Sequence, residues 1–331
     1  MELLVQKPGR RWASRVDFLS TDYADCLWMN RLERNKLRGV LLPVTTPFAN
    51  GGDVDLRALE TNLGKWNRTN VSGYVVLGST GERVHLDESE YLRLIELARR
   101  CVPTDLAFIV GAGQQSTIGT IREINRAAEA GADAVLVITP HYYRAAITQE
   151  TLVSYYRDVA DASPVPLLLY SMPALTGIKI EPATVTRLSE HANIIGVKDS
   201  SNDIAKLAET ISLCPSDFAV MTGNGTVFLD ALEAGATGAI LAVGCVVPEI
   251  CVEISRAFKA DEVRRAHQLQ TTLTPLATAV TTRFGIGGLK FALDLAGYRG
   301  GEVRAPLQAP DDNARTEISK LLDDAASARN A

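Results

Sequence analysis

The sequence contains few cysteines and histidines, and neither residue type follows a pattern that binds metals or forms disulfide bonds. The five cysteines, in a chain of 331 residues, are odd in number, widely spaced and never part of a C-x-x-C pair. This argues against a disulfide framework and against a thiolate zinc site. The four histidines show no H-E-x-x-H spacing, which argues against a histidine-based metal centre. We therefore expect a protein without a metal ion, in a reducing compartment.

The sequence also lacks long apolar runs and an excess of charge of either sign. A bilayer-spanning helix takes roughly 18 apolar residues, whereas the most apolar stretch, 234–247, is shorter and is interrupted by three glycines. The net charge is −5, from 34 basic and 39 acidic side chains. These values argue against extended disorder and against a basic nucleic-acid binder. We predict a soluble, cytoplasmic protein without membrane or nucleic-acid partners; a mitochondrial location is the alternative if the source is eukaryotic.

Eight short apolar runs form the main pattern of the chain, and each is followed by a segment that reads as helical. Hydrophobicity without alternation is typical of strands that are buried on both faces of a parallel sheet. Eight strand–helix units in unbroken alternation predict a TIM (β/α)8 barrel, with a doubly wound open sheet as the competing fold. The runs lie at 39–46, 73–78, 106–111, 134–139, 165–170, 194–198, 218–222 and 238–243.

The chain is longer than a single barrel, which takes roughly 250 residues, and we place the surplus at its two ends. We expect an N-terminal arm or leader at 1–38, the barrel core at 39–247 and C-terminal helices packed on the barrel at 248–331. Those helices are expected at 249–259, 261–279 and 284–295, with a helix or frayed tail in the last dozen residues. Within the barrel, Asp87 followed by Glu90 has the pattern of a helix N-cap with a glutamate three residues later.

The first 38 residues contain both basic and acidic side chains, whereas a mitochondrial transit peptide is poor in acidic residues. Met29 offers a second plausible start directly ahead of the first run. We therefore interpret 1–28 as a leader, an N-terminal arm or an over-extended start.

Lys198 is the only lysine at the predicted carboxyl ends of the strands, where the active site of a TIM barrel lies. Strand alternation places Ile194, Gly196, Lys198 and Ser200 on one face, which can be the barrel interior. A lysine amine is a nucleophile only when it is neutral, and apolar surroundings favour the neutral form. Lys198 is therefore a candidate imine-forming lysine; the alternative is a side chain that points to solvent beyond the strand end.

Two further features lie at the same end of the predicted barrel. Tyr170 ends the strand before that of Lys198, so its phenol can lie beside the amine, although it can also be an aromatic plug on the rim. The turn that follows the second strand carries backbone N–H groups and two hydroxyls that can hold a small carboxylate; the alternative is a capped strand-to-helix connection. This turn is Gly78-Ser79-Thr80-Gly81-Glu82.

From about residue 39 to about residue 310 the chain resembles the pyruvate-dependent class I aldolases, which include dihydrodipicolinate synthase, N-acetylneuraminate lyase and 4-hydroxy-2-oxoglutarate aldolase. The 28 residues from Tyr170 to Lys198 are also the spacing of that family. The motifs that carry the resemblance occur in order: Gly78-Ser79-Thr80-Gly81-Glu82, Thr139-Pro140-His141-Tyr142-Tyr143, Tyr170-Ser171-Met172-Pro173-Ala174-Leu175-Thr176-Gly177 and Ile195-Gly196-Val197-Lys198-Asp199-Ser200.

The resemblance implies a lysine imine mechanism with no cofactor besides the covalent bond to the substrate. Lys198 would form a Schiff base with the keto carbon of pyruvate or of a longer 2-oxo acid, and Tyr170 would be the acid/base. Thr80 would link Tyr170 to Tyr142, which in this family enters from a partner subunit, so the expected assembly is a homodimer or homotetramer. The expected substrate-binding residues are Ser79, Thr80, Ser200, Gly223 and Leu175.

The resemblance also bears on the substrate. Dihydrodipicolinate synthases carry an arginine where this chain has Leu175, which disfavours aspartate semialdehyde, and Gly225 and Thr226 replace the acidic pair of N-acetylneuraminate lyases. Ser200 and the segments 282–286 and 304–308 look most like 4-hydroxy-2-oxoglutarate aldolases, although the animal enzymes tend to carry asparagine in place of Thr80. We expect an oxo-acid lyase that reversibly cleaves 4-hydroxy-2-oxoglutarate to pyruvate and glyoxylate. Three alternatives use the same lysine: an activity like 4-hydroxy-tetrahydrodipicolinate synthase, an activity like N-acetylneuraminate lyase, and a 2-keto-3-deoxy sugar acid aldolase or dehydratase. Two others do not: a metal-dependent aldolase, and a barrel that only binds or regulates.

Overall fold

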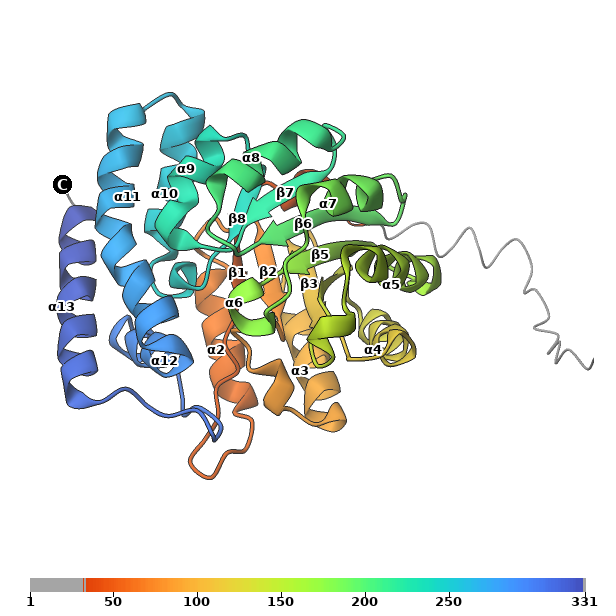
Figure 1. The fold of residues 1–331 in the computed structure, drawn as a ribbon. Coiled ribbons are helices and arrows are strands. Elements are labelled where there is room, and N and C mark those ends of the chain that lie inside the picture. Colours follow the sequence, from red (N-terminus) through yellow and green to blue (C-terminus); the bar gives the residue numbers. More distant parts are fainter. Residues whose placement is uncertain (1–31, 33, 330–331) are drawn as a thin grey trace, which may run out of the picture. The chain divides into compact units, whose positions relative to one another are not determined.

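A computed structural model of the protein describes residue 32 and residues 34–329, and these form a closed barrel of eight parallel strands surrounded by helices (Figure 1). The strands pair in sequence order, and β8 closes on β1, so the predicted TIM barrel is confirmed. Most of the predicted N-terminal arm lies outside the described residues. The strands are β1 (Gly39–Pro43), β2 (Gly73–Val76), β3 (Ala107–Ala112), β4 (Ala134–Ile138), β5 (Leu167–Ser171), β6 (Ile194–Asp199), β7 (Ala219–Thr222) and β8 (Gly238–Ile240).

The strands are apolar throughout because each of them faces two separate apolar regions. One set of side chains fills the barrel interior, and it includes Leu41, Ile109, Leu136 and Met221. The alternate set packs between the barrel and its helices in a much larger cluster. Burial on both faces removes the polar–apolar alternation of a half-exposed sheet, which is why the strands appear as unbroken apolar runs.

A bulge in β6 changes which of its residues face the interior. Leu167 of β5 pairs with Ile194 and the next residue, Leu168, pairs with Gly196, so Ile195 is an extra residue on β6. Ile194 therefore belongs to the outer cluster and Ile195 to the interior cluster. The prediction that Ile194 shares the face of Lys198 was wrong, because it assumed an unbroken alternation.

The helices cover the outside of the barrel and several begin at side-chain caps. Asp87 and Glu90 form a complete capping box at the start of α3, as their spacing predicts. Thr148 and Asp203 cap α5 and α8 by accepting a hydrogen bond from a backbone N–H in the first turn. The helices between strands are α2 (Leu56–Trp66), α3 (Glu88–Cys101), α4 (Thr117–Glu129), α5 (Gln149–Ala162), α6 (Pro173–Thr176), α7 (Pro182–Ser189), α8 (Ile204–Leu213) and α9 (Phe228–Glu233). Short helical turns follow several strands: η2 (Arg83–His85), η3 (Arg144–Ala146), η4 (Gly225–Val227) and η5 (Val243–Cys245), while η1 (Arg34–Leu37) precedes β1.

After β8 the chain is helical, and it first completes the ring around the barrel. The helix α10 (Pro248–Lys259) packs on β1 and α9, which is the position of the helix that follows the eighth strand of a barrel. The chain continues through α11 (Val263–Thr278), the π-helical turn η6 (Ala279–Arg283), α12 (Gly285–Leu295) and α13 (Asp312–Arg329). Figure 1 shows α13 beside α11 and α12, with which it is in contact.

The expected helix at 261–279 differs from the structure at both ends. Asp261 adopts a left-handed backbone conformation with φ of 59°, so α11 begins only at Val263. At the other end the chain widens into the π-helical turn, which no sequence signal indicated. No helix in the described part of the chain is long and apolar enough to cross a membrane.

Candidate active site

Lys198 and Tyr170 occupy the carboxyl ends of two neighbouring strands and lie against each other. They are direct partners in the register of β5 and β6, and the Lys198 Nζ lies 4.5 Å from the centre of the Tyr170 ring. Each side chain is only 5% exposed. The structure thus places Lys198 within the barrel end rather than in solvent. The amine is thus shielded from bulk water and lies against the ring of Tyr170, a side chain that can exchange protons, which is an arrangement that nucleophilic catalysis by lysine uses.

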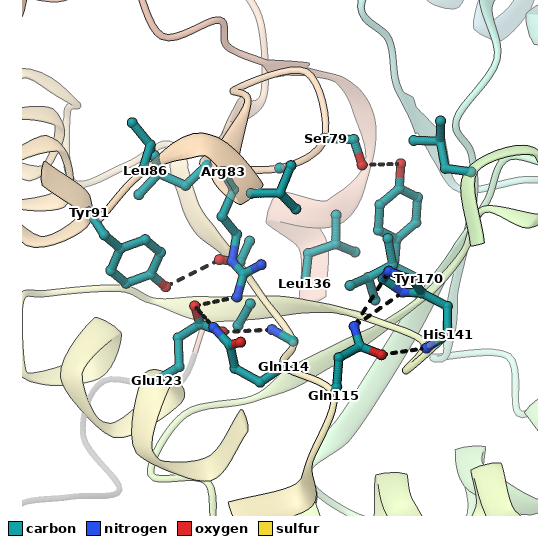
Figure 2. A pocket seen from close by; sticks show the side chains of 18 of the residues that line it. Ser79, Arg83, Leu86, Tyr91, Gln114, Gln115, Glu123, Leu136, His141 and Tyr170 are labelled. Atoms are coloured by element: carbon teal, nitrogen blue, oxygen red, sulfur yellow. Dashed lines mark hydrogen bonds and ion pairs between the residues drawn. The ribbon is translucent and has the colours of Figure 1, made fainter. Parts of the chain in front are cut away.

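The turn after β2 brings one hydroxyl to Tyr170. The Oγ of Ser79 lies 3.3 Å from the Tyr170 hydroxyl, and either group can be the donor (Figure 2). The neighbouring Thr80 is buried, but it is Ser79 that lies at hydrogen-bond distance from Tyr170. The expectation that Thr80 makes this link is thereby corrected. The reason is geometric, because successive residues of a tight turn point in different directions.

The same turn leaves backbone N–H groups available for an anion. Gly81 and Glu82 donate their N–H groups to the carbonyls of Gly78 and Ser79, within the turn itself. The N–H groups of Ser79 and Thr80 have no backbone acceptor among the described residues. Unpaired N–H groups of successive residues in a turn are suited to a carboxylate.

Gly223 makes room for Lys198 and Ser200 rather than donating to a ligand. Its N–H donates to the carbonyl of Asp199 at 2.6 Å, so this donor is already used. A Cβ at this position would lie 1.9 Å from the Oγ of Ser200 and 2.7 Å from the Cε of Lys198. The glycine after β7 thus allows the lysine side chain to occupy its place at the barrel end.

A cavity of about 600 Å³ opens beside Ser79 and Tyr170 at the ends of β2 to β5. Leu136 and Ile138 of β4 give it an apolar floor. Its other side carries Arg83, which forms an ion pair with Glu123 (Figure 2). Arg83 and Glu123 are pocket residues that the sequence analysis did not identify, because they lie 40 residues apart in two helical elements and belong to no recognisable motif.

Tyr91 also lines this cavity, but as a structural donor. Its hydroxyl donates to the carbonyl of Gly111 at 3.2 Å. Burial raises the pKa of Tyr91, so this phenol stays protonated. Tyr91 therefore holds the end of β3, whereas Tyr170 has a hydroxyl partner in Ser79.

Tyr142 lies in the loop that follows β4. It is 75% exposed and packs edge to face against Tyr143, with 5.0 Å between the ring centres. Gln115 fixes the backbone of this loop, because its Oε1 accepts hydrogen bonds from the N–H groups of His141 and Tyr142, both at 2.8 Å. Gln115 is a further residue that the sequence analysis missed; its position just after β3 was the only signal.

Leu175 lies in the short helix α6 and lines the cavity with an exposed apolar side chain. The two arginines that line the cavity are both paired, Arg83 with Glu123 and Arg126 with Glu88. The cavity wall at Leu175 therefore contributes apolar surface and no cation.

The described residues contain no group of three or more histidine, cysteine or acidic side chains that could hold a metal ion. The cysteines of this part of the chain, Cys101, Cys214, Cys245 and Cys251, are free thiols. Burial raises the pKa of Cys245 and of Cys251, which keeps both thiols protonated.

Comparison with known proteins agrees with this architecture. The sequence model of the Dihydrodipicolinate synthetase family matches residues 36–325. A 4-hydroxy-tetrahydrodipicolinate synthase from Methanothrix thermoacetophila is 34% identical over 286 residues, which cover 86% of this chain and 96% of that protein. A protein of the same name from Macrococcus caseolyticus is 34% identical over 82% of this chain and 90% of its own length.

Solved structures of the same family also superpose on this chain. A monomeric variant of dihydrodipicolinate synthase superposes with a TM-score of 0.85 at 29% identity, covering 89% of this chain and 99% of the variant. A prophage protein of the dihydrodipicolinic acid synthase family from E. coli K12, solved in complex with pyruvate, superposes with a TM-score of 0.82 at 29% identity. That match covers 87% of this chain and 98% of the prophage protein. The chain belongs to the dihydrodipicolinate synthetase family, whose enzymes are lyases of the aldolase type.

Proposed function

We propose that the protein is a class I aldolase in which Lys198 forms an imine with the keto carbon of pyruvate or of a longer 2-oxo acid. The observation that carries this proposal is the buried contact of Lys198 with Tyr170, whose hydroxyl in turn lies 3.3 Å from Ser79. A nucleophile next to an acid/base that is itself oriented by a third group is the arrangement that covalent catalysis uses. No cofactor is needed, because the imine itself withdraws the electrons.

The proposed reaction proceeds in the following order for a 4-hydroxy-2-oxo acid. The neutral amine of Lys198 attacks C2, and loss of water gives the protonated imine. Tyr170 removes the proton of the C4 hydroxyl, the bond between C3 and C4 breaks, and its electron pair moves into the imine to give an enamine. The aldehyde leaves, the enamine is protonated at C3, and water releases pyruvate from Lys198.

The turn after β2 would hold the carboxylate next to the keto carbon. The N–H groups of Ser79 and Thr80 and the Ser79 hydroxyl are the donors that support this role. Two further predicted contacts, Ser200 and Gly223, lie against Lys198 rather than in the cavity wall, so we assign them to the space around the amine. A cation is not required for this carboxylate, because N–H dipoles alone form anion sites.

For the second half of the substrate we propose the short glyoxylate unit of 4-hydroxy-2-oxoglutarate. Leu175 stands where dihydrodipicolinate synthases carry an arginine that holds a second carboxylate, which disfavours aspartate semialdehyde. Glyoxylate carries a carboxylate as well, so the support for this unit is its short length and the likeness of Ser200 and of segments 282–286 and 304–308 to 4-hydroxy-2-oxoglutarate aldolases. N-acetylneuraminate and 2-keto-3-deoxy sugar acids carry longer hydroxylated tails, for which the apolar wall at Leu175 offers no partner.

A 4-hydroxy-tetrahydrodipicolinate synthase activity is the second candidate, and the names of the relatives favour it. The two candidates share the imine at Lys198 and differ in the aldehyde that the enamine meets. They therefore predict different substrates but the same covalent intermediate.

A substrate panel separates the candidates. Purified protein is assayed with 4-hydroxy-2-oxoglutarate, with pyruvate plus aspartate semialdehyde, with N-acetylneuraminate and with 2-keto-3-deoxy sugar acids, in the presence of a chelator. We expect the highest kcat/KM for release of pyruvate and glyoxylate from the first substrate, and none with Lys198→Ala. Faster condensation of pyruvate with aspartate semialdehyde would overturn the assignment in favour of the synthase. Leu175→Arg is the matched variant, and it should raise the condensation activity relative to the cleavage of 4-hydroxy-2-oxoglutarate.

We also propose that the active assembly is a homodimer or a tetramer in which Tyr142 reaches the site of a partner subunit. Its exposure and the fixed loop backbone at Gln115 support this role, since an exposed, oriented aromatic side chain is suited to an interface. The cytoplasmic location stays a prediction.

A further inference from the structure

The turn that carries Ser79 is bounded on both sides by strained residues. Leu77 and Glu82 adopt left-handed backbone conformations, with φ of 59° and 54°. Neither is a glycine, and such residues keep this conformation only when their surroundings hold them in place. Between them lies Ser79, whose hydroxyl is 3.3 Å from that of Tyr170. The position of this hydroxyl therefore depends on whatever holds the two ends of the turn.

At its first end, the turn is held by close packing against strand β3. Leu77 is buried in the apolar cluster between the barrel and its helices. A Cβ on Gly111 of β3 would lie 2.2 Å from the carbonyl oxygen of Leu77, so the two backbones are in direct contact. The Thr46 hydroxyl, after β1, donates to the carbonyl of Gly81 at 2.7 Å. The neighbouring strands thus fix the start and the middle of the turn.

At the other end, the turn is held by a buried ion pair with the C-terminal helices. The Oε1 of Glu82 lies 2.5 Å from the Nζ of Lys290 in α12, and both side chains are at most 2% exposed. The Oε2 of Glu82 accepts a hydrogen bond from the backbone N–H of Arg304 at 3.0 Å. It also lies 3.3 Å from the Nδ1 of His85.

Lys290 is itself fully engaged. Its Nζ donates to the carbonyl of Glu302 at 2.6 Å and lies 4.5 Å from the centre of the Phe48 ring. Among the described residues only Lys290 and Lys198 are buried lysines, and the proposed reaction uses just one of them. The desolvation of two buried charges costs free energy that an apolar pair of the same size would not lose. The contribution of this pair to stability therefore does not by itself explain why it is buried.

We propose that Glu82 and Lys290 are positioning residues that hold the strained turn so that Ser79 meets Tyr170. This rests on the proposed function, in which Tyr170 removes the proton of the C4 hydroxyl. The helices after the barrel thereby act on catalysis without contributing a group to the cavity. A loosened turn leaves Lys198 intact but moves Ser79, and displacements of about 1 Å at such a site cost up to 100-fold in rate.

A double-mutant cycle tests this proposal. Glu82→Gln and Lys290→Met are introduced together, so that no charge is left buried alone, in the wild-type chain and in Ser79→Ala. We expect kcat to fall about tenfold in the wild-type background, and less than twofold in Ser79→Ala, where the positioned hydroxyl is already missing. Glu181→Gln with Lys206→Met is the control, because this pair has the same residue types at 2.6 Å on the surface, and we expect no change from it.

Two outcomes would overturn the proposal: an equal loss of kcat in both backgrounds, or a folded double variant with unchanged kcat. If the double variant does not fold, Glu82→Asp serves in the same cycle, because it keeps the charge but shortens the reach to Lys290. Borohydride trapping of pyruvate on the wild-type protein is measured alongside. Absence of that adduct contradicts the proposed function, whereas additive effects in a protein that forms the adduct contradict only the positioning role.

Discussion

The replacement of Gly223 by alanine probes the packing around Lys198 most directly. The added Cβ would lie 2.7 Å from the Cε of Lys198, where ordinary contacts begin near 3.4 Å. The lysine must therefore retreat by about 0.7 Å, and the Ser200 hydroxyl, at 1.9 Å from the new atom, must rotate away. A misplacement of about 1 Å costs roughly 100-fold in rate, or about 2.7 kcal/mol in transition-state stabilisation. For a displacement of about 0.7 Å we expect kcat/KM to fall by roughly 30- to 100-fold.

The assay measures pyruvate release, the rate of borohydride trapping and the thermal unfolding temperature of Gly223→Ala. We expect trapping to slow with turnover, because the displaced group is the nucleophile itself. Gly64→Ala is the control: a Cβ there meets nothing within 4 Å, and the residue lies inside α2, so we expect full activity and a gain of about 0.5–1 kcal/mol in stability. Wild-type trapping and turnover in a folded Gly223→Ala protein would refute the account of this packing.

Three further predictions concern groups around the site. Tyr170→Phe should still form the adduct with pyruvate but lose roughly 10²- to 10⁴-fold in kcat; equal loss of trapping and turnover would contradict its role as acid/base. Tyr142→Ala should change stability by no more than about 0.5 kcal/mol, because the side chain is 75% exposed. It should nevertheless lower kcat and weaken the proposed assembly, which sedimentation measures. Hydrogen bonds from Arg304 lower the pKa of the Glu90 carboxyl. A carboxyl whose pKa is lower in the folded protein stabilises the fold at pH values above its usual pKa of about 4.3. This stabilisation is lost as the pH falls below that value. The difference in unfolding free energy between wild type and Arg304→Met should therefore shrink below about pH 4.3 in denaturant titrations, and a constant difference would refute this.

The barrel and the pairing of its two main site residues were predictable from the sequence. Strands buried on both faces produce unbroken apolar runs, and consecutive strands of a barrel are neighbours. Tyr170 and Lys198, which end consecutive runs, therefore had to approach each other, and they are direct partners. The capping box of α3 was predictable for a similar reason, because all its groups lie within four residues.

Other features depend on contacts that no local pattern encodes. The extra residue Ile195 is apolar like its neighbours, so the bulge in β6 leaves no trace in the run of apolar residues. Glu82 and Lys290 lie in different parts of the chain, and each alone has the pattern of an ordinary surface residue. The choice between Ser79 and Thr80 depended on side-chain direction in a turn, which composition does not determine.

Reductive trapping with pyruvate tests the central claim most directly, because it reports the imine without assuming a second substrate. The protein is incubated with pyruvate and borohydride, and the modified peptide is identified by mass spectrometry. We predict one reduced pyruvyl group per chain, on Lys198 and absent from Lys198→Ala. Lys290, which is equally buried but held in its ion pair with Glu82, should stay unmodified. An unmodified protein, or an adduct on Lys290 or on a surface lysine instead of Lys198, would contradict the account.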